Sequence, residues 1–181
     1  MMSATFLFCI WLIPAPADYK SLSQEILNLA EQFGFHYFEP HTTLFCGETE
    51  NLTTLKENCK TLFQDTPKIT VKTNGTQVQD EAQHNFFIRL QRTPQLNALY
   101  NRVKILDKNS QYSFDPHLSL SYGVPTEKIN SFSASYMEPK IISFNGISLR
   151  PLKQGSKDIE TIDTIDKIEV SPQEIDNLKN Y

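Results

Sequence analysis

Apolar side chains follow two different patterns in the first part of the chain, a continuous stretch and a helical spacing. The continuous apolar stretch 6–13 predicts a buried strand, and apolar residues at helical spacing predict a helix over 21–33. Ser21 and Gln24 would form a capping box at its start, and Gly34 would end it. Its inward-facing residues would be Leu22, Ile26, Leu29 and Phe33.

The same order of elements returns further along the chain. Asn51 is expected to cap a second helix, and Asn74-Gly75 is typical of a tight hairpin turn where the first half ends. Residues 86–90 then predict a strand, Thr93-Pro94 the start of a helix, and Thr126 the start of a short last helix. Each half is therefore expected to run strand, helix, strand, helix, strand.

The residues beyond Arg150 follow neither pattern clearly. Residues 153–157 are expected to form a polar loop and residues 165–170 a terminal strand. Residues 171–181 are expected to form a short helix or a frayed tail. The chain 1–181 is accordingly interpreted as one domain of two pseudo-symmetric lobes.

Two ten-residue segments, 38–47 and 114–123, repeat the same residue types in the same order. Each contains Phe, an acidic residue, Pro and His, then a hydroxyl residue two positions after the His, and finally Leu and Gly. His41 and His117 are 76 residues apart, which indicates a duplicated half-domain rather than a short repeat.

The spacing within each repeat predicts a shared chemical site. Residues two apart on a strand face the same side, so His41 with Thr43 and His117 with Ser119 would converge if the halves pack about a pseudo-twofold axis. A neutral imidazole can take a proton from water while a protonated one gives a proton to a leaving oxygen. The hydroxyls can donate to phosphate oxygens. This chemistry requires no metal, and the spacing leaves either histidine as the base.

Other interpretations have less support in the sequence. A zinc site would need further ligands, and no third His, Cys or carboxylate has ligand spacing. His36 and His84 lack a hydroxyl residue at the same offset and are interpreted as structural or exposed. Arg89 could reach a phosphate or lie on a strand surface. A nucleotide-binding module without turnover is the non-enzymatic alternative, although both His–hydroxyl pairs are intact.

The repeated order favours an α+β fold in which antiparallel sheets are flanked by helices around a central cleft. A doubly wound parallel sheet is the rival. That architecture usually shows longer runs of Val, Ile and Leu and often a glycine-rich turn between strand and helix, and this sequence has no such turn.

Composition limits the expected partners. The net charge of −4, the pI of about 5.6 and the lack of a long basic run argue against long nucleic acids, whose binding depends on neutralised phosphates. A small anion and a monomeric protein are expected instead. The stretch 6–13 is too short to span a bilayer and has no basic residue before it, so neither membrane insertion nor a secretion signal is expected.

Three cysteines, Cys9, Cys46 and Cys59, show no CxxC pair and no disulfide framework. Free thiols in a reducing cytoplasm are therefore expected, and the cytoplasm is the predicted location. Cys46 is interpreted as a small buried residue rather than a nucleophile.

The paired motifs resemble those of the 2H phosphoesterase superfamily. Within it the chain is similar to the cyclic phosphodiesterases of plants and yeast. The segment Cys9-Ile10-Trp11-Leu12-Ile13-Pro14 resembles that group's first strand with its Trp-x-x-Pro, and residues 117–123 are close to its second motif. The resemblance covers residues 5 to 150, roughly.

This resemblance implies a bilobal fold with a central cleft, no cofactor, and hydrolysis of ADP-ribose 1″,2″-cyclic phosphate to ADP-ribose 1″-phosphate. Nucleoside 2′,3′-cyclic phosphates would be opened to 2′-phosphates. The resemblance also implies that Tyr122 contacts substrate, which requires a bend or bulge because strict alternation turns Tyr122 away from His117. Relatives that resemble 2′-5′ RNA ligases or trim RNA ends carry the same motifs and are the alternative. The short loops and the acidic pI favour a small substrate.

Overall fold

The computed structural model describes residues 5–79, 85–152 and 166–168. Over these residues the elements follow the predicted order, strand, helix, strand, helix, strand, in each half. The first half contains β1 (Phe6–Pro14), α1 (Pro16–Phe33), β2 (Thr42–Thr49), α2 (Leu52–Phe63) and β3 (Ile69–Val78). The second contains β4 (Phe86–Leu90), α3 (Pro94–Val103), the 3-10 turn η1 (Lys104–Leu106), β5 (His117–Ser121), α4 (Thr126–Ser133) and β6 (Ile141–Leu152), followed by β7 (Asp166–Ile168).

The strands described here all pair antiparallel. This confirms the α+β prediction and contradicts the doubly wound parallel alternative. The strand order is β2-β1-β6-β3-β4-β5, and β7 pairs with β6. β6 therefore lies beside β1 of the first half, and β3 lies beside β4 of the second. The two halves of the sequence exchange their last strands, so each lobe is built from both halves.

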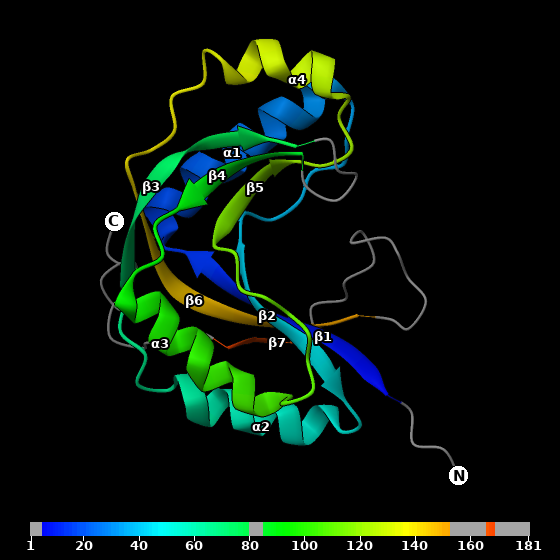
Figure 1. Cartoon of the computed structure of the whole chain (residues 1–181), viewed down its shortest axis with the longest axis vertical. Helices are drawn as coiled ribbons and strands as arrows, with labels where there is room; N and C mark the ends of the chain where they lie inside the picture. The colour runs from blue at the N-terminus through cyan, green and yellow to red at the C-terminus, as the bar shows by residue number, and fades with distance from the viewer. Residues whose placement is uncertain (1–4, 80–84, 153–165, 169–181) are drawn as a thin grey trace, which may run out of the picture.

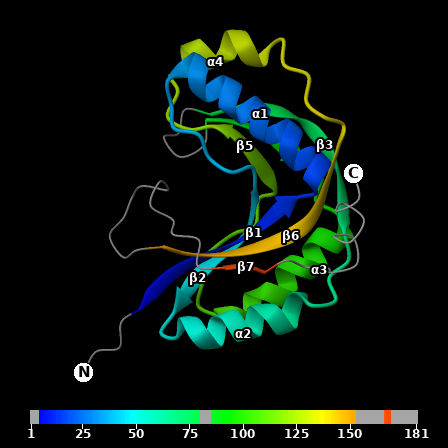
Figure 2. The same ribbon diagram turned by 180° about the vertical axis from the view of Figure 1, so that it is seen from behind.

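Helices cover the two ends of the sheet. α2 and α3 pack on the lobe formed by β1, β2 and β6, whereas α1 and α4 pack on the lobe formed by β3, β4 and β5 (Figure 1). The view from behind shows the same division (Figure 2). The sheet is bent, so that its outermost strands β2 and β5 approach each other. These are the two strands that carry the repeated motifs.

The apolar stretch 6–13 is a buried strand, as predicted. Phe8, Ile10 and Leu12 are fully buried in the core, while Cys9 and Trp11 alternate with them toward the other face of the sheet. One face of β1 therefore packs in the core, and the opposite face carries Cys9 and Trp11.

Three predicted helix ends are confirmed by their capping contacts. The side chain of Asn51 accepts a hydrogen bond from the Thr54 N–H at the start of α2. Thr93 accepts one from the Leu96 N–H at the start of α3. Gly34 ends α1 in the left-handed conformation, with φ 75°.

The predicted start of the first helix at Ser21 is wrong. α1 begins at Pro16, because a proline in the first turn loses no helical hydrogen bond and its φ already suits the helix. The amide of Gln24 binds the side chain of Asn28 on the helix surface and takes no part in a cap.

The predicted hairpin turn at Asn74-Gly75 is also wrong, since β3 runs through both residues. The pairing of β3 with β4 shifts between Thr73 and Thr76, so the two residues between them oppose Arg89 alone and form a β-bulge. Gly75 takes the positive φ of 81° that such a bulge favours. Residues 69–72 pair with β6 and the residues from Thr73 onward pair with β4, so β3 passes from one lobe to the other near this bulge.

The chain end is described only in part. β7 (Asp166–Ile168) lies within the strand expected over 165–170. Residues 153–157 and 171–181, for which a loop and a tail are expected, lie outside the described residues. None of the described helices has the length and apolar character needed to cross a bilayer.

Candidate functional site

The two motif strands share the same irregularity. The pairing of β1 with β2 skips Leu44, and the pairing of β4 with β5 skips Leu120. Both leucines are buried, and they occupy the same position in their motifs. The duplication therefore includes a bulge just after each His–hydroxyl pair, as well as the residue types.

An aromatic ring from the neighbouring strand contacts each motif histidine. Trp11 pairs with Thr43, and its ring stacks on His41 with 3.6 Å between ring centroids and 12° between planes. Phe87 pairs with Ser119, and its ring centroid lies 5.0 Å from that of His117. Trp11 and Phe87 are 76 residues apart, so the repeat extends from the motif strands to β1 and β4.

Both histidine rings are oriented by a main-chain carbonyl two residues earlier. Nδ1 of His41 lies 2.7 Å from the carbonyl oxygen of Glu39, and Nδ1 of His117 lies 2.7 Å from that of Asp115. A carbonyl oxygen can only accept, so Nδ1 carries the proton in each ring. Nε2 is then the atom that accepts a proton in the neutral ring and donates one in the charged ring.

The two histidines differ in their surroundings. His41 is only 7% exposed, whereas His117 is half-buried. Burial lowers the pKa of His41 to about 4; the carbonyl and carboxylate of Glu39 oppose this, and the charges of Arg150 and His117 add to it. His41 is therefore neutral at pH 7. The two rings lie at the starts of strands that approach each other, since β2 and β5 are in contact.

The acidic residue of the first motif binds a buried arginine. The Glu39 carboxylate accepts hydrogen bonds from Arg150 and from the Tyr19 hydroxyl, the latter at 3.0 Å. The guanidinium of Arg150 lies 4.7 Å from the centre of the Trp11 ring that stacks on His41. Burial and Glu39 together raise the pKa of Tyr19, which keeps its hydroxyl protonated as the donor.

The acidic residue of the second motif binds an arginine at the surface. Asp115 pairs with Arg89, whose guanidinium also binds Gln77 and lies 4.9 Å from the centre of the Phe87 ring. Arg89, for which the sequence allowed a phosphate contact, is thus paired with the acidic residue of the second motif. The sequence signal for an arginine partner was the acidic residue before each Pro, which is present in both repeats.

The predicted hydroxyl residues lie beside their histidines on the sheet. Thr43 is partly exposed and Ser119 is buried. Ser119 makes a side-chain hydrogen bond with Tyr122, which lowers the Tyr122 pKa, but burial outweighs it and raises that pKa to about 12. Tyr122 packs on Phe38, with 4.3 Å between ring centroids. The bulge at Leu120 explains why Tyr122 shares the side of Ser119, as the predicted contact with substrate requires.

These features agree with comparisons to known proteins. The model of the cyclic phosphodiesterase-like protein family matches residues 6–134. The chain belongs to this family. The resemblance to 2H phosphoesterases is thereby confirmed, and with it an enzyme family that acts on phosphodiester bonds. Among curated proteins, none matches the chain in sequence.

Solved structures show the same fold. E. coli LigT, complexed with 3′-AMP, has a TM-score of 0.59 and 12% identity, with 93% of this chain and 99% of that chain covered. The protein TT0787 of Thermus thermophilus has a TM-score of 0.54 and 12% identity, with 91% and 97% covered. At such identities the likeness concerns the fold alone, and it extends over nearly the whole chain.

The cysteine prediction is wrong for this cyclic phosphodiesterase-like protein. Cys9 and Cys46 form a disulfide between β1 and β2, where they pair directly with 4.2 Å between Cα atoms. Their positions in the sequence do not reveal this pair, because only the strand register brings them together. Cys46 is half-buried rather than enclosed, and Cys59 is the free, buried cysteine of α2.

The other candidate ligands are not gathered at the site. His36 is exposed, as expected, and His84 lies outside the described residues. Within the part of the chain that the structure describes, no three His, Cys, Asp or Glu side chains form a group that could hold a metal ion.

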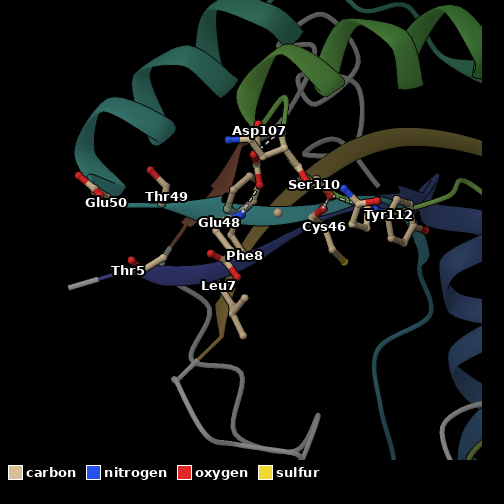
Figure 3. Close-up of a pocket in the computed structure, with 13 residues that line it drawn as sticks. Thr5, Leu7, Phe8, Cys46, Glu48, Thr49, Glu50, Asp107, Ser110 and Tyr112 are labelled. Carbon is tan, nitrogen blue, oxygen red and sulfur yellow. Dashed lines mark hydrogen bonds between the residues drawn. The ribbon is translucent and has the colours of Figure 1, made fainter. Parts of the chain in front are cut away.

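Neither His41 nor His117 lines the cavity of about 710 Å³ that the structure contains between β1, β2 and a nearby loop (Figure 3). We call it the edge groove; β1, β2 and the loop 107–112 form its walls. The loop follows the outer edge of β2 and satisfies its main-chain groups, which protects an edge strand from pairing with other chains. The contacts are Tyr112 hydroxyl to Thr43 carbonyl (3.0 Å), Ser110 hydroxyl to Cys46 carbonyl (2.6 Å) and Glu48 N–H to Asp107 carboxylate (2.9 Å).

Proposed function

We propose that this protein hydrolyses cyclic phosphodiesters of nucleotides, with His41 and His117 as its two proton-transfer groups. The observation that supports this best is the matched pair of Nδ1 hydrogen bonds, which makes Nε2 the proton-transfer atom of both rings. ADP-ribose 1″,2″-cyclic phosphate and nucleoside 2′,3′-cyclic phosphates are the proposed substrates, and the family match supports this class.

The surroundings of the two rings support a division of roles. His41, kept neutral by burial, is the proposed general base: its Nε2 takes a proton from the water that attacks phosphorus. The bond from phosphorus to the 3′ oxygen breaks, and Nε2–H of His117 gives its proton to that oxygen, leaving a 2′-phosphate. Thr43 and Ser119 would donate hydrogen bonds to the non-bridging phosphate oxygens, and Tyr122 would contact the substrate.

Small nucleotides are the proposed partners. E. coli LigT, whose fold this chain shares, was solved with 3′-AMP, with phosphate, with NADP⁺ and with ATP. A substrate of similar size suits a protein of acidic pI with no long basic run. We further propose a monomer that needs no cofactor. The disulfide between Cys9 and Cys46 removes the argument from free thiols on which the cytoplasm was predicted, so no location is proposed.

Substitution of the histidines tests the mechanism. His41→Ala and His117→Ala should each lower kcat for adenosine 2′,3′-cyclic phosphate by at least about 10²-fold, because each proton transfer contributes about 10²–10⁴-fold. His36→Ala is the matched control, since His36 is exposed and outside the motifs. Circular dichroism should show unchanged folding. Near-full activity in either motif variant contradicts the proposal, as does a loss of wild-type activity with EDTA that zinc restores.

The dependence of kcat/KM on pH tests the base assignment. A base must be neutral to act, and the pKa of His41 lies at about 4. The acid limb of kcat/KM should therefore fall near pH 4, well below the value of about 6.5 for an ordinary histidine. A limb at pH 6.5 would contradict His41 as the buried base.

RNA processing is the alternative within the same enzyme class, and the shared fold of LigT is compatible with it. Wild-type protein should be incubated with cyclic nucleotides and, separately, with 2′-5′-linked oligonucleotides. Turnover of the oligonucleotides alone would favour the alternative. Binding of cyclic nucleotides without turnover would favour a nucleotide-binding module.

A further inference from the structure

The lining of the edge groove includes residues from both faces of β1, Leu7 and Phe8, and Leu7 lies on the face that carries the proposed site. Leu7 and Trp11 alternate with the core residues of β1 and therefore share one face. Leu7 pairs with Glu48 and Trp11 pairs with Thr43, so this face continues onto β2. In Figure 3 the side chains of Leu7 and Cys46 point to the same side of the two strands. The side of the groove formed by Leu7 and Cys46 is thus on the same face of the sheet as His41.

The register also sets the distance between the groove and the histidines. Leu7 lies four residues from Trp11 on the same strand, about 13 Å at the usual rise per residue, and Trp11 stacks on His41. A nucleoside that itself carries the reactive phosphate stays close to His41. A second nucleoside, joined to the first through a further phosphate, can reach the groove, whose nearer end is formed by Tyr112.

The walls of the groove carry hydrogen-bond acceptors and negative charge. Glu48, Glu50 and Asp107 line it, and the described lining contains no Lys or Arg. Carboxylates accept hydrogen bonds from hydroxyl and amino groups, as they do from the ribose of bound dinucleotides. A phosphate placed beside them would be repelled. The volume of about 710 Å³ is that of a small-ligand site.

We infer that the edge groove binds a terminal nucleoside with free hydroxyls, at the end of the substrate away from the cyclic phosphate. A phosphorylated end is disfavoured there. The inference rests on the proposed function, because the cyclic phosphate must lie between His41 and His117. It adds a second binding site and a selectivity that the histidine motifs do not contain.

Three cyclic phosphates with the same reactive end test the inference. They are adenosine 2′,3′-cyclic phosphate, a diadenosine with a terminal 2′,3′-cyclic phosphate and a free 5′-hydroxyl, and the same diadenosine with a 5′-phosphate. For the wild-type protein, kcat/KM should be about tenfold higher with the 5′-hydroxyl than with the 5′-phosphate, because the carboxylates repel the added charge.

A charge-removing variant tests the same groove from the protein side. Glu48→Gln combined with Glu50→Gln should lower the ratio of the two dinucleotides toward one, with Asp107 still charged, and leave the rate with the mononucleoside unchanged. Both residues are exposed, so the fold should persist. Glu57→Gln is the matched control, because Glu57 is exposed on α2 and does not line the groove.

The outcomes separate the two proposals. Turnover of the mononucleoside with equal kcat/KM for the two dinucleotides would overturn the groove and leave the proposed function standing. A ratio that the double substitution does not change would do the same. Absence of turnover with all three substrates would overturn the proposed function and, with it, the inference.

Discussion

At the scale of single residues, the acidic residue of each motif links a histidine to an arginine. Its carbonyl orients the imidazole, and its carboxylate pairs with a guanidinium that lies over the aromatic neighbour of that imidazole. The two clusters differ in burial. In the first, the side chains of Arg150 and Glu39 are 5% and 17% exposed, whereas that of Asp115 in the second is 62% exposed.

This difference predicts unequal effects of equivalent substitutions. Glu39→Gln removes the carboxylate that pairs with the buried guanidinium of Arg150 and should lower the free energy of unfolding by about 3 kcal/mol. Asp115→Asn removes an exposed carboxylate and should change it by less than about 1 kcal/mol. Urea denaturation of both variants measures these values. Equal effects would show that the first cluster is not stabilised by its buried ion pair.

The sequence predicts only part of these clusters. His41, Thr43, His117 and Ser119 are found because local alternation on a strand places each pair on one side. Ser119 and Tyr122 come together through a bulge, whose need is visible in the sequence but whose position is not. The partners of Glu39 come from α1 and β6, and no local pattern can identify residues that meet only after the chain folds.

At the scale of elements, local signals predicted which segments form helices and strands better than they predicted which strands pair. The element order follows from apolar spacing, which each segment carries by itself. Gly75 has the positive φ that its sequence signal indicates, but the pairing of β3 with β6 and β4 turned the expected hairpin into a bulge. The pairing of Cys9 with Cys46 depends in the same way on the register of β1 and β2.

The disulfide between β1 and β2 gives an element-scale prediction. In oxidised, unfolded protein one thiol should titrate, that of Cys59, and three should titrate after reduction. Because the bridge closes a segment of 37 residues, Cys9→Ser with Cys46→Ser should lower the free energy of unfolding by about 3–4 kcal/mol. Reductant should destabilise the wild type and leave the double variant unchanged. Three reactive thiols without reductant would contradict the pairing.

At the scale of the whole molecule, the duplication in the sequence does not coincide with the lobes of the structure. β6 completes the sheet of β1 and β2, and β3 completes that of β4 and β5. β3 and β6 also pair with each other where the lobes join. Neither half of the sequence contains a complete lobe. This arrangement was hidden in the sequence, because a repeat reveals the order of elements and not which strands they join.

The exchanged strands predict that the two lobes unfold together. Opening one lobe removes β3 or β6 from its place and so disrupts the sheet of the other, which favours a single cooperative transition. Native-state hydrogen exchange at increasing urea concentrations measures the opening free energy of each lobe separately. The slowest amides of β1, in the first lobe, and of β4, in the second, should converge on one opening free energy. Loss of protection in one lobe at a lower urea concentration would mean that the lobes are separate folding units, and that the chain is not the single domain proposed from its sequence.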